Sequence, residues 1–362
     1  MGDYMKVVIS AGGTGGHIFP AISIINKIKE YDKNAEILYI GTTDRMEHEI
    51  IPKMNIPYFG IEIKGLSKNI KKSIHSINLL LKSLKIVKNK LKEFNPDIVI
   101  GVGGYVTFPV IFCAKKLGIK TMIHEQNSIP GKSNRQLIKY TDKICVSLPG
   151  SIKYFPKEKT IFTGNPRSSE IVKVKKISKK ELGFIENKKL VLIVMGSLGS
   201  KTINDELKKI IIDFSNKDYQ VLLVTGQNYY DEFKEFKINN VKIVPFLENM
   251  LNVLKSCDLI VTRAGASTIA EITAIGLPSI LVPSPYVANN HQFYNAMELV
   301  NANASLLLEE KDFNKDNLLK LIDKVLENET LYKNMHLNSL KLGKTTSSDE
   351  ILKIILDLIG SD

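Results

Sequence analysis

The stretch KVVISAGGTGGHIFPA, residues 6–21, joins a short apolar run to a turn with four glycines and then to the start of an amphipathic helix. Residues 6–10 have the length of a strand, and Pro20 is tolerated in the first turn of the helix that follows. Glycines let the backbone approach a ligand closely, and the amides at a helix start favour phosphate. The stretch therefore predicts an anion-binding turn in a Rossmann-like unit, although a tight turn alone would need only two glycines.

The glycine turn departs from the dinucleotide-binding pattern. Its spacing does not match G-x-G-x-x-G. The second expected strand, residues 36–40, ends in Gly41-Thr42 and not in the acidic residue that would hold a ribose. Both differences disfavour NAD binding, and with it a redox enzyme.

Strand-length apolar runs alternate with segments of helical period along the chain, which is typical of parallel α/β sheets. Strands are expected at residues 6–10, 36–40, 97–102, 120–124 and 143–147, and again at 190–195, 220–225, 241–246, 258–262 and 279–283. The two series predict two doubly wound domains. The join is expected near Gly164-Asn165-Pro166-Arg167, which gives residues 1–164 and 165–345.

The composition is that of a globular chain long enough for two domains, with 362 residues of which 44% are hydrophobic and 24% charged. We expect neither a membrane span nor a secretion signal, because no long apolar run and no leader-like start are present. The isolated cysteines Cys113, Cys145 and Cys257 are expected to be reduced packing residues.

The formal charge of +12 favours an anionic partner, which could be a phosphorylated ligand, nucleic acid or an acidic membrane surface. Arginine is rare in this lysine-rich chain. The four arginines are Arg45, Arg135, Arg167 and Arg263. Each could bind phosphate or carboxylate through its planar fork, or form a buried ion pair, and the sequence leaves both alternatives open.

His17 is the candidate general base. It lies where the first glycine turn becomes a helix, so its imidazole is expected at the carboxyl edge of the sheet. Histidine titrates near neutrality and can take a proton from a sugar hydroxyl, and the helix start is expected to keep it neutral. Helix capping is the alternative, but serine, aspartate or asparagine would cap better.

Further polar turns follow other expected strands. In the first half these are GVGGY, with Gly103, Gly104 and Tyr105, and HEQN, with His124 and Asn127. They supply several donors and acceptors suited to a hydroxyl-rich ligand. In the second half they are MGSLGS, residues 195–200, which predicts a second phosphate turn, and TRAGAST, residues 262–268.

Three polar residues follow these turns in the second half. Glu271 lies on the helix after residues 262–268 and could accept two hydrogen bonds from a ribose diol, or simply place a charge near a helix start. His291 and Gln292 begin another helix near the same edge.

Residues 70–92 predict a basic amphipathic helix. One face carries six apolar residues, three further apolar residues lie outside that face, and the segment holds seven lysines. The face is Ile70, Ile74, Ile77, Leu81, Leu84 and Leu91, and the additional residues are Leu79, Leu80 and Ile86. Such a helix can rest on an anionic bilayer, but an ordinary surface helix is the alternative.

The motifs together resemble those of the MurG family of N-acetylglucosaminyltransferases, in order and along nearly the whole chain. They are AGGTGGHIFPA (11–21), GVGGY (101–105), HEQNSIPG (124–131), TGNPR (163–167), GSLGS (196–200), RAGASTIAEITAIGLPSILVP (263–283) and NNHQ (289–292). The resemblance implies a GT-B fold, with two Rossmann-like domains facing a central cleft. It also implies that a last helix, within residues 346–362, returns to pack on the N-terminal domain.

The resemblance implies the binding roles as well. The C-terminal domain would hold UDP-N-acetylglucosamine through Arg167, Ser197, Leu247, Ala266, Ser267, Thr268, Ile269, Ala270, Glu271, His291 and Gln292, and Asn127 of the N-terminal domain would reach its sugar. The N-terminal domain would take the lipid-linked acceptor, lipid I, through Thr14, Gly15, Gly16, Gly103, Gly104, Tyr105 and His124, with His17 as the base.

The reaction implied is an inverting transfer of N-acetylglucosamine to the C4 hydroxyl of lipid I, which gives lipid II in peptidoglycan synthesis. No metal, no other cofactor and no nucleic acid is expected. Residues 70–92 would then associate with the anionic membrane surface, at its cytoplasmic face and peripherally. A transferase acting on diacylglycerol, a UDP-sugar epimerase and a noncatalytic UDP-sugar sensor are the alternatives.

Two departures from the family pattern affect single residues. Arg167 follows Pro166 directly, whereas in relatives the arginine stands either one or two places after the corresponding proline. Met195 and Leu198 stand where many relatives have glycine and glutamine.

Overall fold

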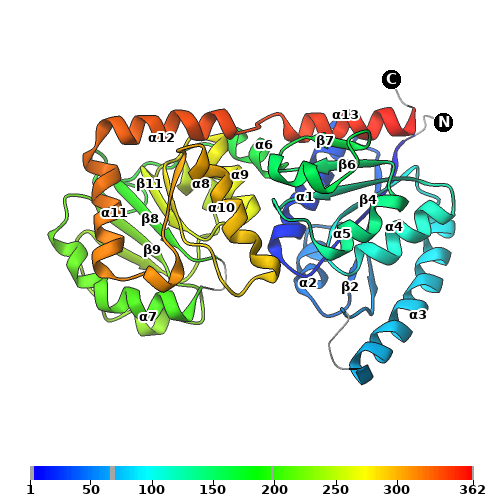
Figure 1. Cartoon of the computed structure of the whole chain (residues 1–362), viewed down its shortest axis with the longest axis horizontal. Coiled ribbons are helices and arrows are strands. Elements are labelled where there is room, and N and C mark those ends of the chain that lie inside the picture. Colours follow the sequence, from blue (N-terminus) through cyan, green and yellow to red (C-terminus); the bar gives the residue numbers. More distant parts are fainter. Residues whose placement is uncertain (1–3, 66–69, 197–198, 361–362) are drawn as a thin grey trace. The chain divides into compact units, whose positions relative to one another are not determined.

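The computed structural model describes residues 4–65, 70–196 and 199–360, and it contains two compact units. The first comprises Met1–Arg167 and Thr345–Asp362, and the second Ser168–Lys344. Each unit is a parallel sheet with helices packed on it (Figure 1).

The first unit contains a seven-stranded parallel sheet with the order β3-β2-β1-β4-β5-β6-β7. Its strands are β1 Lys6–Ala11, β2 Glu36–Thr42, β3 Tyr58–Ile61, β4 Ile98–Gly103, β5 Lys120–Glu125, β6 Lys143–Val146 and β7 Thr160–Phe162. Its helices are α1 Gly15–Tyr31, α2 Met46–Lys53, α3 Ile70–Phe94, α4 Thr107–Lys116, α5 Lys132–Leu137, η1 Ile138–Tyr140, η2 Pro149–Tyr154 and α13 Ser347–Ile359. The strand order reverses direction between β1 and β4, and ligands of open α/β sheets bind at such a switch point.

The second unit contains a six-stranded parallel sheet with the order β10-β9-β8-β11-β12-β13. Its strands are β8 Leu190–Val194, β9 Gln220–Val224, β10 Val241–Val244, β11 Leu259–Thr262, β12 Ser279–Leu281 and β13 Ser305–Leu307. Its helices are α7 Lys201–Ile210, η3 Ile211–Asn216, η4 Tyr230–Glu232, α8 Met250–Leu254, α9 Ala266–Ala274, η5 Ala288–Asn290, α10 His291–Asn301, η6 Glu310–Asp312, α11 Lys315–Glu327 and α12 Glu329–Leu342. Helix α6, Arg167–Lys173, begins at the last residue of the first unit. The switch point of this sheet lies between β8 and β11.

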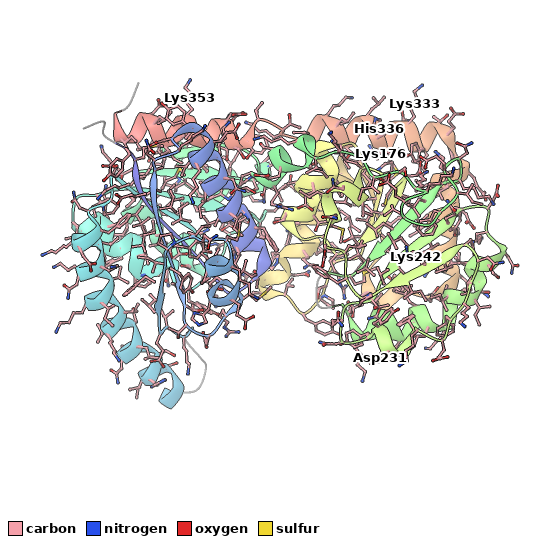
Figure 2. All side chains as sticks on the ribbon, turned by 180° about the vertical axis from the view of Figure 1, so that it is seen from behind. Lys176, Asp231, Lys242, Lys333, His336 and Lys353 are labelled. Atoms are coloured by element: carbon pink, nitrogen blue, oxygen red, sulfur yellow. The ribbon has the colours of Figure 1, made fainter. Side chains whose placement is uncertain are left out.

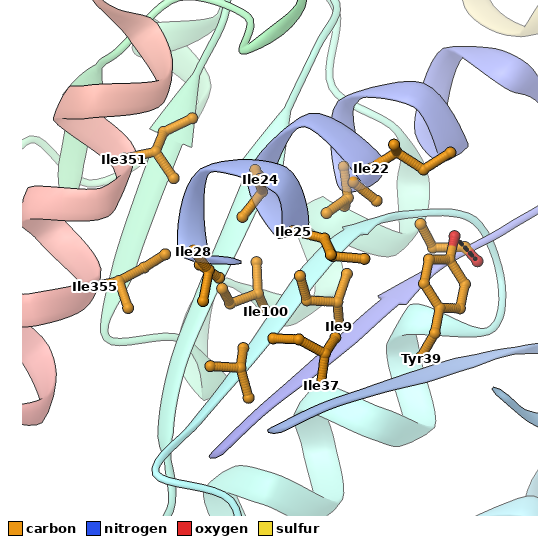
Figure 3. Packing of buried hydrophobic residues seen from close by; sticks show 14 of the residues in the cluster. Ile9, Ile22, Ile24, Ile25, Ile28, Ile37, Tyr39, Ile100, Ile351 and Ile355 are labelled. Carbon is orange, nitrogen blue, oxygen red and sulfur yellow. Dashed lines mark hydrogen bonds between the residues drawn. The ribbon is translucent and has the colours of Figure 1, made fainter. Parts of the chain in front are cut away.

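Helix α13 completes the core of the first unit. Ile351 and Ile355 of α13 belong to the same buried cluster as Ile24 and Ile28 of α1, and they point toward α1 in Figure 3. Full burial of one such side chain contributes about 1.5–3 kcal/mol. The C-terminal segment is therefore part of the first unit's core, although more than 170 residues separate it from Arg167 in the sequence.

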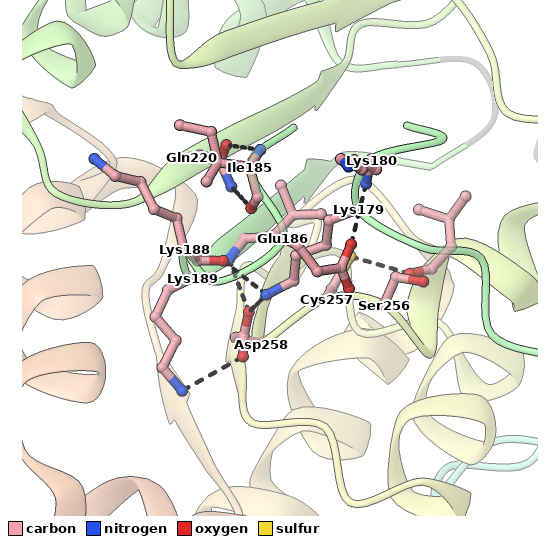
Figure 4. Close-up of polar contacts among 12 residues, drawn as sticks. Lys179, Lys180, Ile185, Glu186, Lys188, Lys189, Gln220, Ser256, Cys257 and Asp258 are labelled. Atoms are coloured by element: carbon pink, nitrogen blue, oxygen red, sulfur yellow. Dashed lines mark hydrogen bonds and ion pairs between the residues drawn. The ribbon is translucent and has the colours of Figure 1, made fainter. Parts of the chain in front are cut away.

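The lysine-rich segment that opens the second unit is held by Asp258 (Figure 4). Lys179 Nζ donates to Asp258 Oδ2 at 2.7 Å and to the carbonyl oxygen of Lys188 at 2.7 Å. Asp258 Oδ2 also accepts the backbone N–H of Leu190 at 2.8 Å, which fixes the start of β8. The Asp258 carboxylate thus fixes the irregular segment before β8 through Lys179 and Leu190.

Other lysines, including Lys176, Lys242, Lys333 and Lys353, extend from the surfaces of the two units (Figure 2). Most of the excess positive charge belongs to the first unit, which has 27 lysine and arginine residues and 17 aspartate and glutamate residues, whereas the second unit has 23 and 21.

The buried stripe of α3 differs from the stripe that the sequence pattern suggested. Leu79, Val87 and Leu91 are buried with the small residues Ser76 and Ser83. The side chains of Ile74, Ile77 and Leu81 are instead 55%, 46% and 60% exposed. Helix α3 packs on α4, where Cys113 Sγ lies 3.3 Å from the carbonyl oxygen of Leu84.

Within residues 4–65, 70–196 and 199–360, no helix has both the length and the apolar character needed to cross a bilayer.

Candidate functional site

The first candidate site lies at the switch point of the first unit, where the turn after β1 meets the end of β4. The N–H of Gly12 donates to the carbonyl oxygen of Gly103 at 3.1 Å. Gly104 has a φ of +94°, and a Cβ there would lie 2.5 Å from the oxygen of Gly12. Glycine is therefore required at Gly104 both by the backbone conformation and by the close approach of the two turns.

His17 lies in the first turn of α1, against the backbone of Gly103. Its Nδ1 is 3.0 Å from the carbonyl oxygen of Gly12. A Cβ on Gly103, whose φ is +117°, would lie 2.6 Å from His17 Cδ2. A carbonyl oxygen can only accept, so this hydrogen bond requires the proton on Nδ1 and leaves the lone pair of the neutral ring on Nε2. The contact with a carbonyl also shows that this ring nitrogen does not cap the helix amides.

The acceptor-side residues suggested by the sequence gather around the same point. Thr14 is the N-cap of α1, and Gly15 and Gly16 form its first turn. Gly103 ends β4, and the exposed ring of Tyr105 follows it. The ring of Tyr105 lies over Gly65, where a Cβ would be 2.4 Å from Tyr105 Cζ.

His124 occupies the interior of the first unit. It is fully buried, and burial lowers its pKa to about 4, so it is neutral at physiological pH. Its Nε2 donates to the carbonyl oxygen of Gly164 at 3.0 Å, and its Nδ1 accepts from Gln126 Nε2 at 2.9 Å. The resemblance placed His124 beside the acceptor, and the full burial of its ring does not fit that position. His124 stabilises the loop of residues 124–131 from the interior, through its hydrogen bond with Gln126.

Glu125 holds the loop that carries Asn127. Its carboxylate accepts from the backbone N–H of Asn127 at 2.9 Å, from the N–H of Gly131 at 3.0 Å and from Asn134 Nδ2 at 2.8 Å. The side chain of Asn127 also donates, from Nδ2 to Glu125 Oε1 at 3.3 Å. Glu125 is 2% exposed, so this carboxylate fixes the loop.

Arg167 lies beside α1 and is the last residue of the first unit. Its guanidinium is 5.5 Å from the centre of the Phe19 ring, and its backbone N–H donates to Asn165 Oδ1 at 3.1 Å. The family resemblance implied that Arg167 contacts the donor's diphosphate. The structure places it beside Phe19 near the start of α1, the helix that follows the first anion-binding turn.

The second candidate site lies at the switch point of the other sheet. Gly199 has a φ of +73°, and a Cβ there would lie 2.2 Å from the carbonyl oxygen of Thr225. Asn204 Nδ2 donates to the same oxygen at 2.9 Å. The turn therefore runs tightly over the end of β9 into α7. Ser197, the expected phosphate contact, lies outside the described residues.

Arg263 forms a buried ion pair beside this turn. Its Nη2 lies 2.6 Å from Glu310 Oε2 and donates to Ser200 Oγ at 2.8 Å, and its Nη1 donates to the carbonyl oxygen of Val282 at 3.1 Å. Of the two roles that the sequence left open for this arginine, the ion pair is the one found. The pair positions Ser200, the residue before α7.

Helix α9 presents some of its expected donor-binding residues and buries others. Ser267, Thr268 and Ala270 are partly exposed, whereas the side chains of Ala266 and Ile269 pack in the interior. Ser267 Oγ is buried without a hydrogen-bond partner among the described residues, as expected for a hydroxyl that a ligand would satisfy. Glu271 is 6% exposed.

Of the remaining donor-side residues, His291 and Gln292 begin α10 and Leu247 lies in a loop. His291 Nδ1 is 2.8 Å from the carbonyl oxygen of Ala288, and Gln292 Oε1 accepts the backbone N–H of Ser284 at 2.9 Å. Asn290, before α10, has the left-handed φ of +50° that asparagine tolerates. Leu247 is half-buried in the loop after β10.

Glu47 was missed by the reasoning from sequence. It is fully buried and contacts the first glycine turn. The signal available was an acidic residue in the first turn of a helix, shortly after the end of a strand. That position is usually read as a favourable charge at a helix start.

Among the described residues, no group of three or more histidine, cysteine, aspartate and glutamate side chains is arranged to hold a metal ion.

Comparison with known proteins places this architecture in a class. Residues 7–146 match the glycosyltransferase family 28 N-terminal domain, and residues 190–351 match the glycosyltransferase family 28 C-terminal domain. With its two parallel sheets, the chain has the fold of the GT-B glycosyltransferases.

Two curated relatives share the name UDP-N-acetylglucosamine–N-acetylmuramyl-(pentapeptide) pyrophosphoryl-undecaprenol N-acetylglucosamine transferase. One, from Bacillus cytotoxicus, is 42% identical over 98% of this chain and 100% of its own length. The other, from Bacillus licheniformis, is 43% identical over 98% and 99%. The crystal structure of Acinetobacter baumannii MurG matches with a TM-score of 0.79 at 27% identity, over 98% of this chain and 99% of that one. The chain belongs to the MurG family of glycosyltransferase family 28.

A more distant match shares only the fold. A putative UDP-N-acetylglucosamine 2-epimerase from Listeria monocytogenes has a TM-score of 0.72 at 15% identity, over 99% of this chain and 98% of that one.

Proposed function

We propose that this enzyme transfers N-acetylglucosamine from UDP-N-acetylglucosamine to the C4 hydroxyl of the N-acetylmuramyl residue of lipid I, which gives lipid II for peptidoglycan synthesis. The observation that supports this most is the 42–43% identity over 98% of the chain to relatives named for that transfer. The two glycine turns, one at each switch point, offer a place for two separate diphosphates.

The second unit takes the donor in this proposal. The backbone amides at the start of α7 and α9 would stabilise the negative charge of the donor's diphosphate, and the Ser267 hydroxyl would add a further hydrogen-bond donor. Glu271 would accept the ribose hydroxyls, and the backbone at Leu247 would contact the uracil. The first unit takes the acceptor, whose diphosphate would meet the amides of Thr14, Gly15 and Gly16.

His17 performs the proton transfer. Its Nε2 takes the proton of the C4 hydroxyl while that oxygen forms a bond to C1 of N-acetylglucosamine. The bond from C1 to the phosphate oxygen breaks at the opposite face, so the configuration at C1 inverts and UDP leaves. The fixed dipoles at the start of α7 and the charge of Arg167 stabilise the negative charge on the leaving diphosphate.

Transfer is expected to proceed without a divalent metal, because helix-start amides and a guanidinium supply the positive potential at the diphosphate. Initial rates with EDTA should equal those with added Mg²⁺ within about two-fold. A rate that vanishes in EDTA and returns with Mg²⁺ would contradict this expectation.

Helix α3 is proposed to dock on the membrane that carries the acceptor, with the protein bound peripherally at the cytoplasmic face. Its exposed residues Ile74, Ile77 and Leu81 form a stripe at helical spacing, and lysines such as Lys82, Lys85 and Lys88 lie exposed nearby. Apolar burial in the headgroup region and about 1 kcal/mol for each nearby lysine would act together.

A triple variant tests this docking. Ile74→Gln, Ile77→Gln and Leu81→Gln together should weaken binding to vesicles of anionic phospholipid by about ten-fold or more, since each loses part of the ~1.5–3 kcal/mol of burying an aliphatic side chain. Sedimentation with vesicles measures the binding. The matched control is Ile185→Gln with Ile212→Gln, which changes two similarly exposed isoleucines of the second unit. Equal binding of the triple variant and the wild type would refute the docking role.

The acceptor assay separates the enzymatic alternatives. With labelled UDP-N-acetylglucosamine, we expect label in the lipid when a short-chain lipid I analogue is supplied, and none with diacylglycerol. Label in the glycerolipid would indicate the related transferase instead. Epimerised or free sugar without any acceptor would favour an epimerase, and donor binding without turnover on either lipid would favour a sensor.

A further inference from the structure

A buried carboxylate lies beneath the glycine turn of the first unit. Glu47, in the first turn of α2, is 0% exposed. Its Oε2 accepts the backbone N–H of Gly13 at 3.1 Å. Its Oε1 accepts the backbone N–H of Thr42 at 3.1 Å and Thr42 Oγ1 at 2.8 Å. The side chain therefore links the end of β2 to the turn that follows β1.

The surroundings of Glu47 are built for a carboxylate. Among the described residues, no lysine, arginine or histidine forms an ion pair with it, so these three donors are what compensate its loss of hydration. A Cβ on Gly12 would lie 2.4 Å from Glu47 Oε1, and a Cβ on Gly41 would lie 2.8 Å from Glu47 Cγ. Both glycines thus leave the space that the side chain fills.

The turn that Glu47 holds is the one that orients His17. The carbonyl oxygen of Gly12 accepts from His17 Nδ1 at 3.0 Å, and the N–H of Gly12 donates to the carbonyl oxygen of Gly103 at 3.1 Å. On the preceding side, Tyr39 Oη donates to the carbonyl oxygen of Ala11 at 3.1 Å (Figure 3). The Ala11-Gly12 peptide is therefore held by Tyr39 and Gly103, and the Gly12-Gly13 peptide is held by Glu47 at its N–H and by His17 at its carbonyl oxygen.

We infer that Glu47 is a positioning residue for the transfer reaction: it fixes the Gly12-Gly13 turn and, through the Gly12 carbonyl, the orientation and tautomer of His17. The inference rests on the proposed role of His17 as the base. Since the Gly13 N–H is bound to Glu47, the amides left for the acceptor diphosphate in this turn are those of the following residues.

The test is Glu47→Gln, which keeps the shape of the side chain. Both carboxylate oxygens of Glu47 accept hydrogen bonds, and in glutamine one of these two acceptors is replaced by an NH₂ donor. We expect kcat to fall about 10- to 100-fold, because a small displacement of a catalytic group costs up to that factor. The KM for UDP-N-acetylglucosamine should stay within two-fold. In a His17→Ala background, Glu47→Gln should lower kcat by less than two-fold, because the lost positioning then has no base to act on.

Asp32→Asn is the matched control. Asp32 also accepts two backbone N–H groups, those of Met5 at 2.9 Å and Asn34 at 2.9 Å, but it lies at the opposite end of β1. The control should lower the melting temperature and leave kcat unchanged. If Glu47→Gln does not fold, Glu47→Asp, which keeps the charge but has a shorter reach, should give a smaller fall in kcat that likewise disappears in the His17→Ala background.

Three outcomes overturn the inference. If Glu47→Gln, or Glu47→Asp in its place, keeps full kcat while His17→Ala loses it, Glu47 does not position the base, although the base assignment stands. If the loss adds in full to that of His17→Ala, Glu47 acts by another route. If His17→Ala keeps the full rate, the base assignment itself fails, and the inference falls with it.

Discussion

Replacing His17 by alanine is expected to lower kcat by about 10²- to 10⁴-fold, the usual contribution of a general base. The physical reason is the geometry of the ring, whose Nδ1 is held 3.0 Å from the Gly12 carbonyl oxygen so that the lone pair lies on Nε2. The dissociation constant for UDP-N-acetylglucosamine should not change, because the proposed donor residues of the second unit remain intact. Single-turnover rates and titration calorimetry measure the two quantities.

His336→Ala provides the control for this variant. His336 Nδ1 lies 2.7 Å from the carbonyl oxygen of Gly276, so the control removes the same kind of histidine–carbonyl bond from α12 of the second unit (His336 is labelled in Figure 2). It should keep the wild-type rate. A His17→Ala protein that binds the donor normally and transfers at full rate would refute the base assignment.

Replacing Glu271 by glutamine is expected to weaken UDP binding by about 10- to 100-fold, because hydrogen bonds to a charged acceptor contribute roughly 1.5–3 kcal/mol each. The side chain is 6% exposed on α9, where solvent screens the interaction little. Calorimetry with UDP and with 2′-deoxy-UDP measures the effect. The wild type should prefer UDP, and the variant should bind the two nucleotides nearly equally.

Glu327→Gln, an exposed carboxylate of α11, is the control for Glu271 and should bind UDP as the wild type does. A Glu271→Gln protein that still distinguishes UDP from its 2′-deoxy form by the full wild-type ratio would show that the ribose is held elsewhere.

Most central strands could be predicted from the sequence, because a parallel strand buried on both faces is a nearly continuous apolar run. β8 begins at the expected Leu190 and β9 at the expected Gln220. The short strands β3, β7 and β13 were missed. Each lies at an edge of its sheet and pairs on one side, so few residues carry the apolar signal.

Periodicity alone could not decide which face of α3 is buried. Residues 70–92 contain more apolar side chains than one stripe needs, and both Leu79 and Leu81 fit an apolar face. Packing against α4 accompanies burial of the face that carries Leu79, Val87 and Leu91, together with Ser76 and Ser83. Such a choice depends on the partner helix, which a single helical pattern does not contain.

The site residues also divide into those that local sequence could predict and those that depend on distant contacts. The glycine turns and His17 were predictable, because a strand, a glycine turn and a helix start follow one another directly in the sequence. The burial of His124 and the support given by Glu47 were not, because each depends on hydrogen bonds to distant residues, such as Gly164 for His124 and Gly13 for Glu47.

The structure of the reaction product tests the central claim most directly. The enzyme would be incubated with UDP-N-acetylglucosamine and a short-chain lipid I analogue, and the purified lipid analysed by NMR. We predict one N-acetylglucosamine joined to C4 of the muramyl sugar with the β configuration, inverted from the α linkage of the donor, in amounts equal to the UDP released. UDP release with free sugar and an unmodified lipid, or an α-linked product, would contradict the account.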